Sequence, residues 1–187
     1  MPANYSNCSG CPYCNQTHLK GTSYYSNANS PLSIDMGNNA DTLLIFQAPG
    51  ADEWAGGTNT SSGNRIPIDS KNTRSTAERM RKSMNRKGVN RSDYDITEAV
   101  QCFPGRGISG RDKKPNAKSQ KYCLAHLVND LSQKKYRKII AFGQVAHENA
   151  LAAVNAVNAM GNISQPQPTP APHPSSGVSD TTLNSSY

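Results

Sequence analysis

Five cysteines are the residues with the clearest potential for chemistry in this 187-residue chain: Cys8, Cys11, Cys14, Cys102 and Cys123. A Cys-x2-Cys spacing near the start, joined by two distant cysteines, is typical of a metal or cluster site in a cytosolic protein, where disulfides are rare. The spacing alone fits a four-cysteine zinc site, an iron-sulfur cluster or unrelated buried thiols. Ligation would tie the N-terminal segment to the rest of the fold and add folding energy.

Basic residues are the second chemical feature. The chain has 20 Lys and Arg against 13 Asp and Glu, which gives a net charge of +7. Nine basic residues lie between Arg65 and Arg91, six between Arg106 and Lys121, and four between Lys134 and Lys138. Such clusters suit a phosphate backbone, although a single cluster is often only a solvated helix face. Three clusters in one short chain favour a nucleic acid as partner.

Composition excludes several classes of protein. The hydrophobic fraction is 35%, with 14 Gly and 12 Pro, which indicates a modest core with long irregular segments and excludes a collagen or a coiled coil. The length fits one domain. No apolar run approaches the roughly 20 residues that span a bilayer, and the N-terminus lacks the features of a secretory signal. We therefore expect a cytoplasmic monomer that does not enter a membrane.

The apolar pattern predicts the elements that position these residues. Strands are predicted at 42–46, 94–102 and 137–143, and helices at 75–87, 117–134 and 144–160. This alternation predicts an α/β fold, a three-layer α/β/α arrangement with a central parallel sheet and right-handed crossovers. Within a single domain spanning 1–187, residues 1–40 form an irregular cysteine-bearing N-terminal cap, residues 41–177 the α/β core and residues 178–187 a tail.

Two further segments are predicted to be irregular. Residues 50–74 are rich in Gly, Asn, Thr and Ser and form a long loop, a length that is usually functional or disordered. Ser75 and Glu78 make a capping box for the helix that follows. Residues 165–174 contain five prolines and are predicted to be extended. The strand at 42–46 stops at the long loop, so a site at its carboxyl end is expected.

Six short motifs occur in order across most of the chain. They are Cys8-Ser-Gly-Cys11, Phe46-Gln-Ala-Pro-Gly-Ala-Asp-Glu53, Ile96-Thr-Glu-Ala-Val-Gln-Cys102, Cys123, Ile139-Ile-Ala-Phe-Gly-Gln-Val-Ala146 and His173-Pro-Ser-Ser176. Each motif alone is weak, but their order resembles that of the iron-sulfur uracil-DNA glycosylases of the uracil-DNA glycosylase superfamily. The resemblance implies DNA as partner and a [4Fe-4S] cluster as cofactor, in place of the alternative Zn. The implied ligands are Cys8, Cys11, Cys102 and Cys123, with Cys14 as an alternative in a Cys11 and Cys14 pair.

The active-site pair of that family is altered in this chain. The family has a Glu in its first motif and an Asn after Ile-Thr, whereas this chain has Gln47 and Glu98. In one interpretation Glu98 faces the pocket and carries the anionic role, or accepts from the amino group of an altered base, while Gln47 orients water or the base. In the other, Asp52 or Glu53 supplies the carboxylate and Glu98 pairs with a nearby Arg.

Other site residues follow from the same resemblance. His173 is expected to donate to the base carbonyl that becomes anionic on leaving. Ser175 and Ser176 are expected to press the minor groove, and Ala48, Pro49 and Gly50 to line the substrate site. Trp54 is either a core residue or a stacking platform for the flipped base.

The resemblance predicts a monofunctional DNA glycosylase that hydrolyses the N-glycosidic bond of a flipped uracil or modified pyrimidine and leaves an abasic site. An ionised Glu98 can only accept hydrogen bonds, which would favour a base with an amino group over uracil. The alternatives are therefore an anti-viral glycosylase specific for a hypermodified, cytosine-derived base, and a catalytically inactive DNA-binding module.

Overall fold

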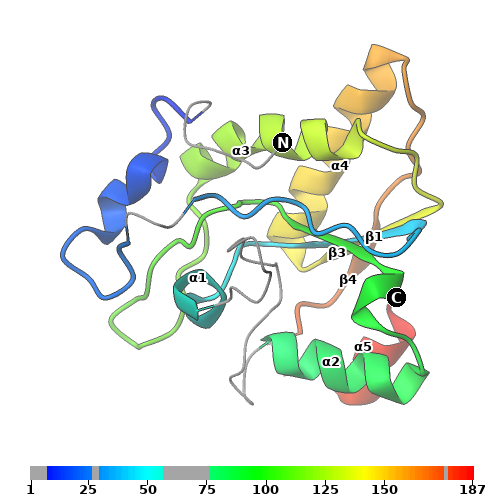
Figure 1. The fold of residues 1–187 in the computed structure, drawn as a ribbon, viewed down its shortest axis with the longest axis horizontal. Helices are drawn as coiled ribbons and strands as arrows, with labels where there is room; N and C mark the ends of the chain where they lie inside the picture. The colour runs from blue at the N-terminus through cyan, green and yellow to red at the C-terminus, as the bar shows by residue number, and fades with distance from the viewer. Residues whose placement is uncertain (1–7, 27–29, 57–75, 175–176) are drawn as a thin grey trace.

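The structure, a computed structural model, describes residues 8–26, 30–56, 76–174 and 177–187. Four parallel strands make one sheet in the order β2-β1-β3-β4 (Figure 1). The strands are β1 (Thr42–Phe46), β2 (Asp95–Glu98), β3 (Lys138–Phe142) and β4 (Thr169–Ala171). The helices are α1 (Ala51–Gly56), α2 (Thr76–Lys87), α3 (Ala117–Leu131), α4 (Gln144–Met160) and α5 (Asp180–Ser185), with 3-10 turns η2 (Cys14–Leu19) and η3 (Arg91–Asp93). The predicted three-layer α/β/α fold with a parallel sheet is confirmed.

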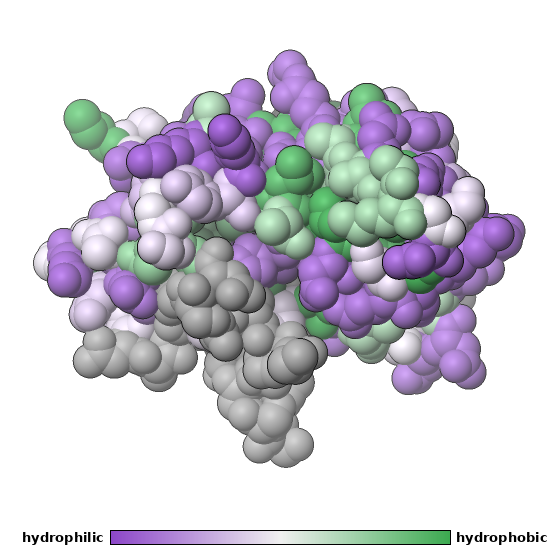
Figure 2. Space-filling view, turned by 90° about the horizontal axis from the view of Figure 1, so that it is seen from above, coloured by the Kyte–Doolittle hydropathy of each residue, from purple (hydrophilic) through white to green (hydrophobic). Residues whose placement is uncertain are grey.

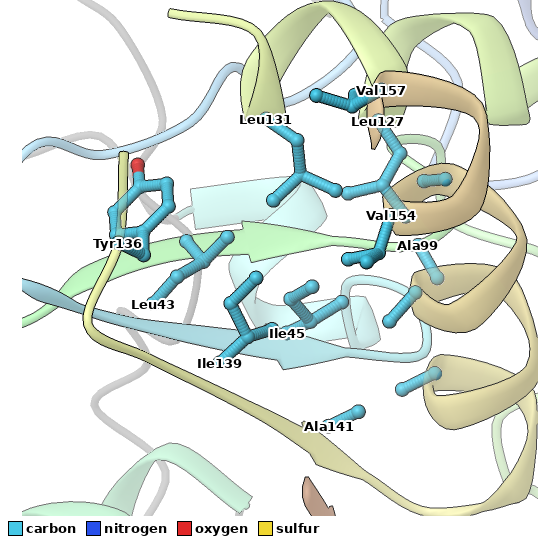
Figure 3. Close-up of a cluster of buried hydrophobic side chains, with 13 residues drawn as sticks. Leu43, Ile45, Ala99, Leu127, Leu131, Tyr136, Ile139, Ala141, Val154 and Val157 are labelled. Carbon is cyan, nitrogen blue, oxygen red and sulfur yellow. The ribbon is translucent and has the colours of Figure 1, made fainter. Parts of the chain in front are cut away.

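One face of the sheet is covered by α3 and α4. Side chains of β1 and β3 that point to this face pack against apolar residues of the two helices (Figure 3). The sheet contributes Leu43, Ile45, Ile139 and Ala141, and the helices contribute Leu127, Leu131, Val154 and Val157. Because side chains alternate along a strand, the residues between them face the other way.

The opposite face is covered by α2 and α5. Leu44 and Phe46 of β1 pack here against Met80 of α2 and Leu183 of α5. The ring of Phe46 stacks on that of Phe142, with centroids 4.6 Å apart. All five residues of β1 are buried, as expected for the central strand of a sheet covered on both faces.

The C-terminal half holds more regular structure than predicted, since residues 165–174 were expected only to be extended and residues 178–187 to be a tail. The proline-rich segment 165–174 contains β4, an edge strand that pairs with β3 through Ile140 opposite Thr169. Pro170 is tolerated there because an edge strand needs partners on only one side. Residues 178–187 are not a tail: Ser179 caps α5, and Leu183 and Tyr187 are buried in the core.

Other boundaries also differ from the predictions. The second strand ends at Glu98 instead of Cys102, although the amides of Ala99 and Val100 still bond to β1 and the residue after it. The helix α3 ends at Leu131. The helix α1 occupies the start of the predicted loop 50–74; Ser75 of the predicted capping box and residues 57–74 lie outside the described residues.

The burial of α5 yields a stability prediction. Replacing Leu183, which has no exposed surface, with Ala should lower the free energy of unfolding by about 2–5 kcal/mol because it leaves a cavity beside Phe46 and Met80. Leu151 on α4 is 37% exposed, and Leu151→Ala should cost well under half of that. Urea denaturation followed by circular dichroism measures both; equal shifts would show that α5 does not pack on the core.

Candidate active site

The carboxyl ends of the four strands meet at one edge of the sheet. Glu98 ends β2, Gln47 follows β1, Gly143 follows β3 and His173 lies two residues after β4. The chain leaves β1 toward α2 on one face, whereas it leaves β3 directly into α4 on the other. In open parallel sheets, ligands bind where the chain leaves neighbouring strands toward opposite faces, so we expect the binding crevice between β1 and β3.

Glu98 is the most unusual side chain at this edge. It is 1% exposed, and its Oε2 accepts no hydrogen bond from the described residues. Burial, reinforced by the nearby carboxyl group of Glu53, raises the pKa of Glu98 well above its ordinary value, and Arg91 opposes this only in part. No ion pair joins Glu98 to the described part of the chain, and Arg91 instead pairs with Asp35 at 2.6 Å.

The raised pKa changes what Glu98 can do. An ionised Glu98 would only accept hydrogen bonds, whereas a protonated carboxyl group both donates and accepts them. A buried carboxyl group that keeps its proton can therefore present the same two hydrogen-bonding functions as the amide of an Asn. The electrostatics do not favour an anionic role for Glu98.

Glu53 is better placed to carry negative charge. It lies in the first turn of α1, is 6% exposed, and its Oε2 accepts a hydrogen bond from the amide of Gly50 at 2.6 Å. A backbone N–H donor favours the ionised form of a carboxyl group. Its neighbour Asp52 is exposed to solvent. Glu53, which accepts from a backbone amide, therefore lies near Glu98, whose Oε2 has no hydrogen-bond donor in the described residues.

His173 packs at the other side of the edge. A Cβ on Gly143 would lie 3.1 Å from the Cβ of His173, so the glycine, at a φ of +88°, permits this close approach. Burial, with a smaller effect from Arg79, lowers the pKa of His173. The imidazole is therefore neutral at pH 7 and can donate one hydrogen bond without carrying charge. Ser175 and Ser176 lie outside the described residues.

The remaining residues of the first motif lie after β1, at the same edge of the sheet. Gln47 and Ala48 are half-buried and Pro49 is buried. Trp54 has no exposed surface, and its Nε1 donates to the carbonyl of Tyr24 at 3.1 Å. This placement matches the core interpretation of Trp54, which anchors α1 and hence Glu53.

The predicted cysteine ligands converge from three distant segments. Cys8, Cys11, Cys102 and Cys123 are all buried in one apolar cluster with Trp54 and Phe103, and Cys14 packs at its margin. Burial and neighbouring thiols raise the pKa of Cys8 to about 11, and burial raises that of Cys123 to about 12. No three His, Cys, Asp or Glu side chains of the described residues are arranged to hold a metal ion. The four cysteines are thus members of one buried cluster, and thiols are the donors that zinc and iron-sulfur clusters take, but their side chains are not gathered around a common metal position in the described residues.

Sequence reasoning missed two residues near these features. The Sγ of Cys8 lies 3.5 Å from Nε2 of His126, whose Cys-x2-His spacing from Cys123 on α3 was the available signal. Asp112 accepts from the amide of Ala51 at 3.3 Å, at the start of α1. Nothing in the local pattern around Asp112 indicated this contact.

The three basic clusters differ in how far they are neutralised. Arg79, Arg81, Lys82 and Arg86 of α2 form ion pairs with Glu78 or Asp180. Between Arg106 and Lys121, only Arg106 is ion-paired within the described ranges, to Asp112. The five other cations are Arg111, Lys113, Lys114, Lys118 and Lys121, all exposed. On the face drawn in Figure 2, hydrophilic side chains predominate and apolar ones gather in patches.

A comparison with known proteins adds one finding. The sequence model of a family described as the uracil DNA glycosylase superfamily matches residues 34–185. No match to the chain was found among curated proteins. None of the helices in the described segments is long and apolar enough to cross a membrane.

The buried Glu98 yields a prediction for the pH dependence of stability. Its folded pKa is raised, so the folded state keeps a proton that the unfolded state releases above about pH 4.3. Between the two pKa values the free energy of unfolding should fall by up to about 1.4 kcal/mol per pH unit. Glu98→Gln, which cannot ionise, should show no such fall and become the more stable form as pH rises. Denaturation between pH 4 and pH 9 measures this, and parallel curves would contradict it.

Proposed function

Because the chain belongs to the uracil-DNA glycosylase superfamily, we propose that it is a monofunctional DNA glycosylase that removes a flipped uracil-type pyrimidine and leaves an abasic site. Superfamily members act on DNA and hydrolyse the bond between base and deoxyribose. The observation that carries the proposal for this chain is the juxtaposition of Glu53 and Glu98 at the carboxyl edge of the sheet, where burial and then the neighbouring Glu53 raise the pKa of Glu98.

The reaction requires two kinds of group. Breaking the N-glycosidic bond builds positive charge on the sugar and negative charge on the departing base, so a carboxylate belongs near the sugar and donors belong on the base. Glu53 takes the first role, because its carboxyl group accepts a hydrogen bond from the amide of Gly50, an arrangement that suits a carboxylate. It can orient the attacking water and balance the charge that develops on the sugar.

Glu98 takes the second role as a neutral acid. A protonated carboxyl group can donate to a base carbonyl and accept from the adjacent imide N–H, which is the pattern that uracil offers. The same group can accept from an exocyclic amine, as in cytosine. Only an ionised Glu98, which accepts hydrogen bonds but cannot donate one, would disfavour uracil. With a protonated Glu98, uracil is the substrate that we favour.

His173 supports the leaving base from the far side of the crevice. Strands lie about 4.8 Å apart, so the outer strands β2 and β4 are about 14 Å apart, with Gln47 and Gly143 between them. A neutral imidazole at His173 can donate to a carbonyl oxygen that becomes anionic as the bond breaks. Because burial lowers the pKa of His173, the imidazole carries no positive charge at neutral pH.

We further propose that the chain belongs to the iron-sulfur branch of the superfamily. Cys8, Cys11, Cys102 and Cys123 would hold a [4Fe-4S] cluster, since they are the four cysteines buried together. The cluster would supply folding energy by joining the N-terminal segment to α3 and to the segment after β2. No step of the hydrolysis is assigned to it.

The activity is tested with duplex and single-stranded DNAs that contain uracil, a mismatch or a modified cytosine, followed by alkaline cleavage at abasic sites. We expect cleavage at uracil. Glu53→Gln should lower the excision rate by about two to four orders of magnitude, and its exposed neighbour provides the control Asp52→Asn, which should change it little. Binding without alkali-sensitive sites would indicate a DNA-binding module. Loss of activity in the control variant alone would assign the carboxylate to Asp52.

The cofactor is tested by metal analysis of anaerobically purified protein. We expect a brown protein with about four irons per chain. Cys123→Ser should lose iron and stability, whereas Cys14→Ser should keep both. Colourless protein with stoichiometric zinc would overturn the cluster, and loss of iron in Cys14→Ser but not in Cys8→Ser would assign the N-terminal pair to Cys11 and Cys14.

A further inference from the structure

Ile108 carries the most exposed large apolar side chain of the described residues. Its exposure is 110% of the reference value, against 58% for Met160, the next in rank. An apolar side chain of this size loses a favourable burial of about 1.5–3 kcal/mol when it stays in water. Single exposed apolar residues are common on proteins, so the setting of Ile108 decides what it means.

The backbone around Ile108 forms a hairpin, which we define as residues 105–113. The amide of Lys113 donates to the carbonyl of Gly105 at 2.8 Å, and that of Gly107 to Arg111 at 2.8 Å. A tight turn closes the tip, where the amide of Gly110 donates to Gly107 at 3.0 Å. Ile108 is the second residue of that turn. The hairpin therefore holds Ile108 at its tip instead of letting it fold back onto the core.

The foot of the hairpin is attached to the proposed catalytic loop. Asp112 accepts from the amide of Ala51, and its Oδ2 lies 3.3 Å from where a Cβ on Gly50 would be. Gly50 is also the donor to Glu53. Arg106, on the opposite arm, lies over the ring of Tyr24 at 5.6 Å. In Figure 1 the green loop after β2 lies beside α1 and the blue N-terminal segment, at the end of the sheet where the strands finish.

The charge of the hairpin identifies a polyanionic partner. Arg106, Arg111, Lys113 and the following Lys114 stand within six residues of Ile108 and are exposed. Of these four, only Arg106 forms an ion pair inside the described ranges. A protein partner that buried Ile108 would have to desolvate these cations, whereas a DNA groove offers phosphates on both sides of a stack of apolar base faces.

We propose that the hairpin 105–113 enters a groove of duplex DNA and that Ile108 inserts between base pairs beside the crevice, filling the gap left by the nucleotide that the enzyme takes out of the stack. This inference rests on the proposed glycosylase function. Apolar side chains wedged between base steps are an established means of unstacking DNA. Ile suits this role because its branched side chain is stiff at χ1. The cations position the hairpin on the phosphates, and Asp112 couples its position to Gly50 and Glu53.

The test compares duplex with single-stranded DNA, because only a duplex has a stack to open. Single-turnover excision of uracil would be measured for wild type, Ile108→Ala and Ile108→Leu, with the exposed Met160→Ala as the control. A 2-aminopurine beside the target base reports unstacking. We expect Ile108→Ala to lose about tenfold or more on duplex DNA, with a smaller fluorescence rise, and to lose less than about twofold on single strands. Ile108→Leu should keep most of the activity, and all variants should unfold at the wild-type temperature.

The outcomes separate this inference from the proposed function. If wild type excises uracil but Ile108→Ala matches it on duplex DNA, or loses equally on both substrates, the wedge is wrong and the function stands. If wild type excises no base from any substrate, the function fails; the 2-aminopurine signal on a duplex with an abasic site then still tests insertion of Ile108. Neutralising Lys113 and Lys114 should instead weaken binding to both forms of DNA alike and make its salt dependence shallower. A salt dependence that stays unchanged would contradict the placement of the hairpin on phosphates.

Discussion

All four strands run in the same direction, and this constraint decides where chemistry can take place in the molecule. Parallel strands need crossover helices, and the crossovers bring every carboxyl end to one edge. Glu98, Gln47, Gly143 and His173 lie in four segments spread over 127 positions of the chain, yet each follows or ends a strand of the same sheet. The position of each of these residues follows from the strand that it ends or follows. The hydrogen-bond ladders between strands align all four.

The segments at the carboxyl ends of the strands pack in a third apolar cluster, separate from the clusters on the two faces of the sheet. This cysteine-containing cluster supports the edge, with Trp54 and Phe103 between the N-terminal segment and the chain that follows β2. Trp54 is one residue from Glu53, so the packing of the N-terminal segment fixes α1 and its carboxyl group. Ligation of the four thiols would stiffen the same cluster. A cofactor with no part in the hydrolysis would in this way still affect the geometry of the site.

The sequence was sufficient where apolar periodicity was strong, and insufficient where structure depends on partners distant in sequence. The run at 42–46 and the helix at 144–160 were predicted to the residue, because each contains enough apolar positions to define its period. β4 was missed because Pro170 removes a donor and its neighbours resemble an extended polar segment. α5 was missed because it has six residues and one apolar anchor, Leu183. Glu98 was singled out from its motif, but the end of its strand was predicted four residues too late, and its raised pKa comes from burial and from Glu53, which no local pattern contains.

The protonation of Glu98 also bears on how the site tolerates DNA. If Glu53 and Glu98 were both ionised, both would repel a polyanion such as DNA. Each negative charge brought nearby raises the pKa of a carboxyl group, and the more deeply buried of the two groups is protonated first. That group is Glu98, which has neither an ion pair nor a hydrogen bond to Oε2 within the described residues. Under the proposed function, approach of the phosphates would favour the protonated form of Glu98, while the hairpin cations that form no ion pair within the described residues would offset the charge of the backbone. Bound DNA would in that case help Glu98 to keep the proton with which it recognises the base, and Glu53 would be the carboxylate that faces the sugar.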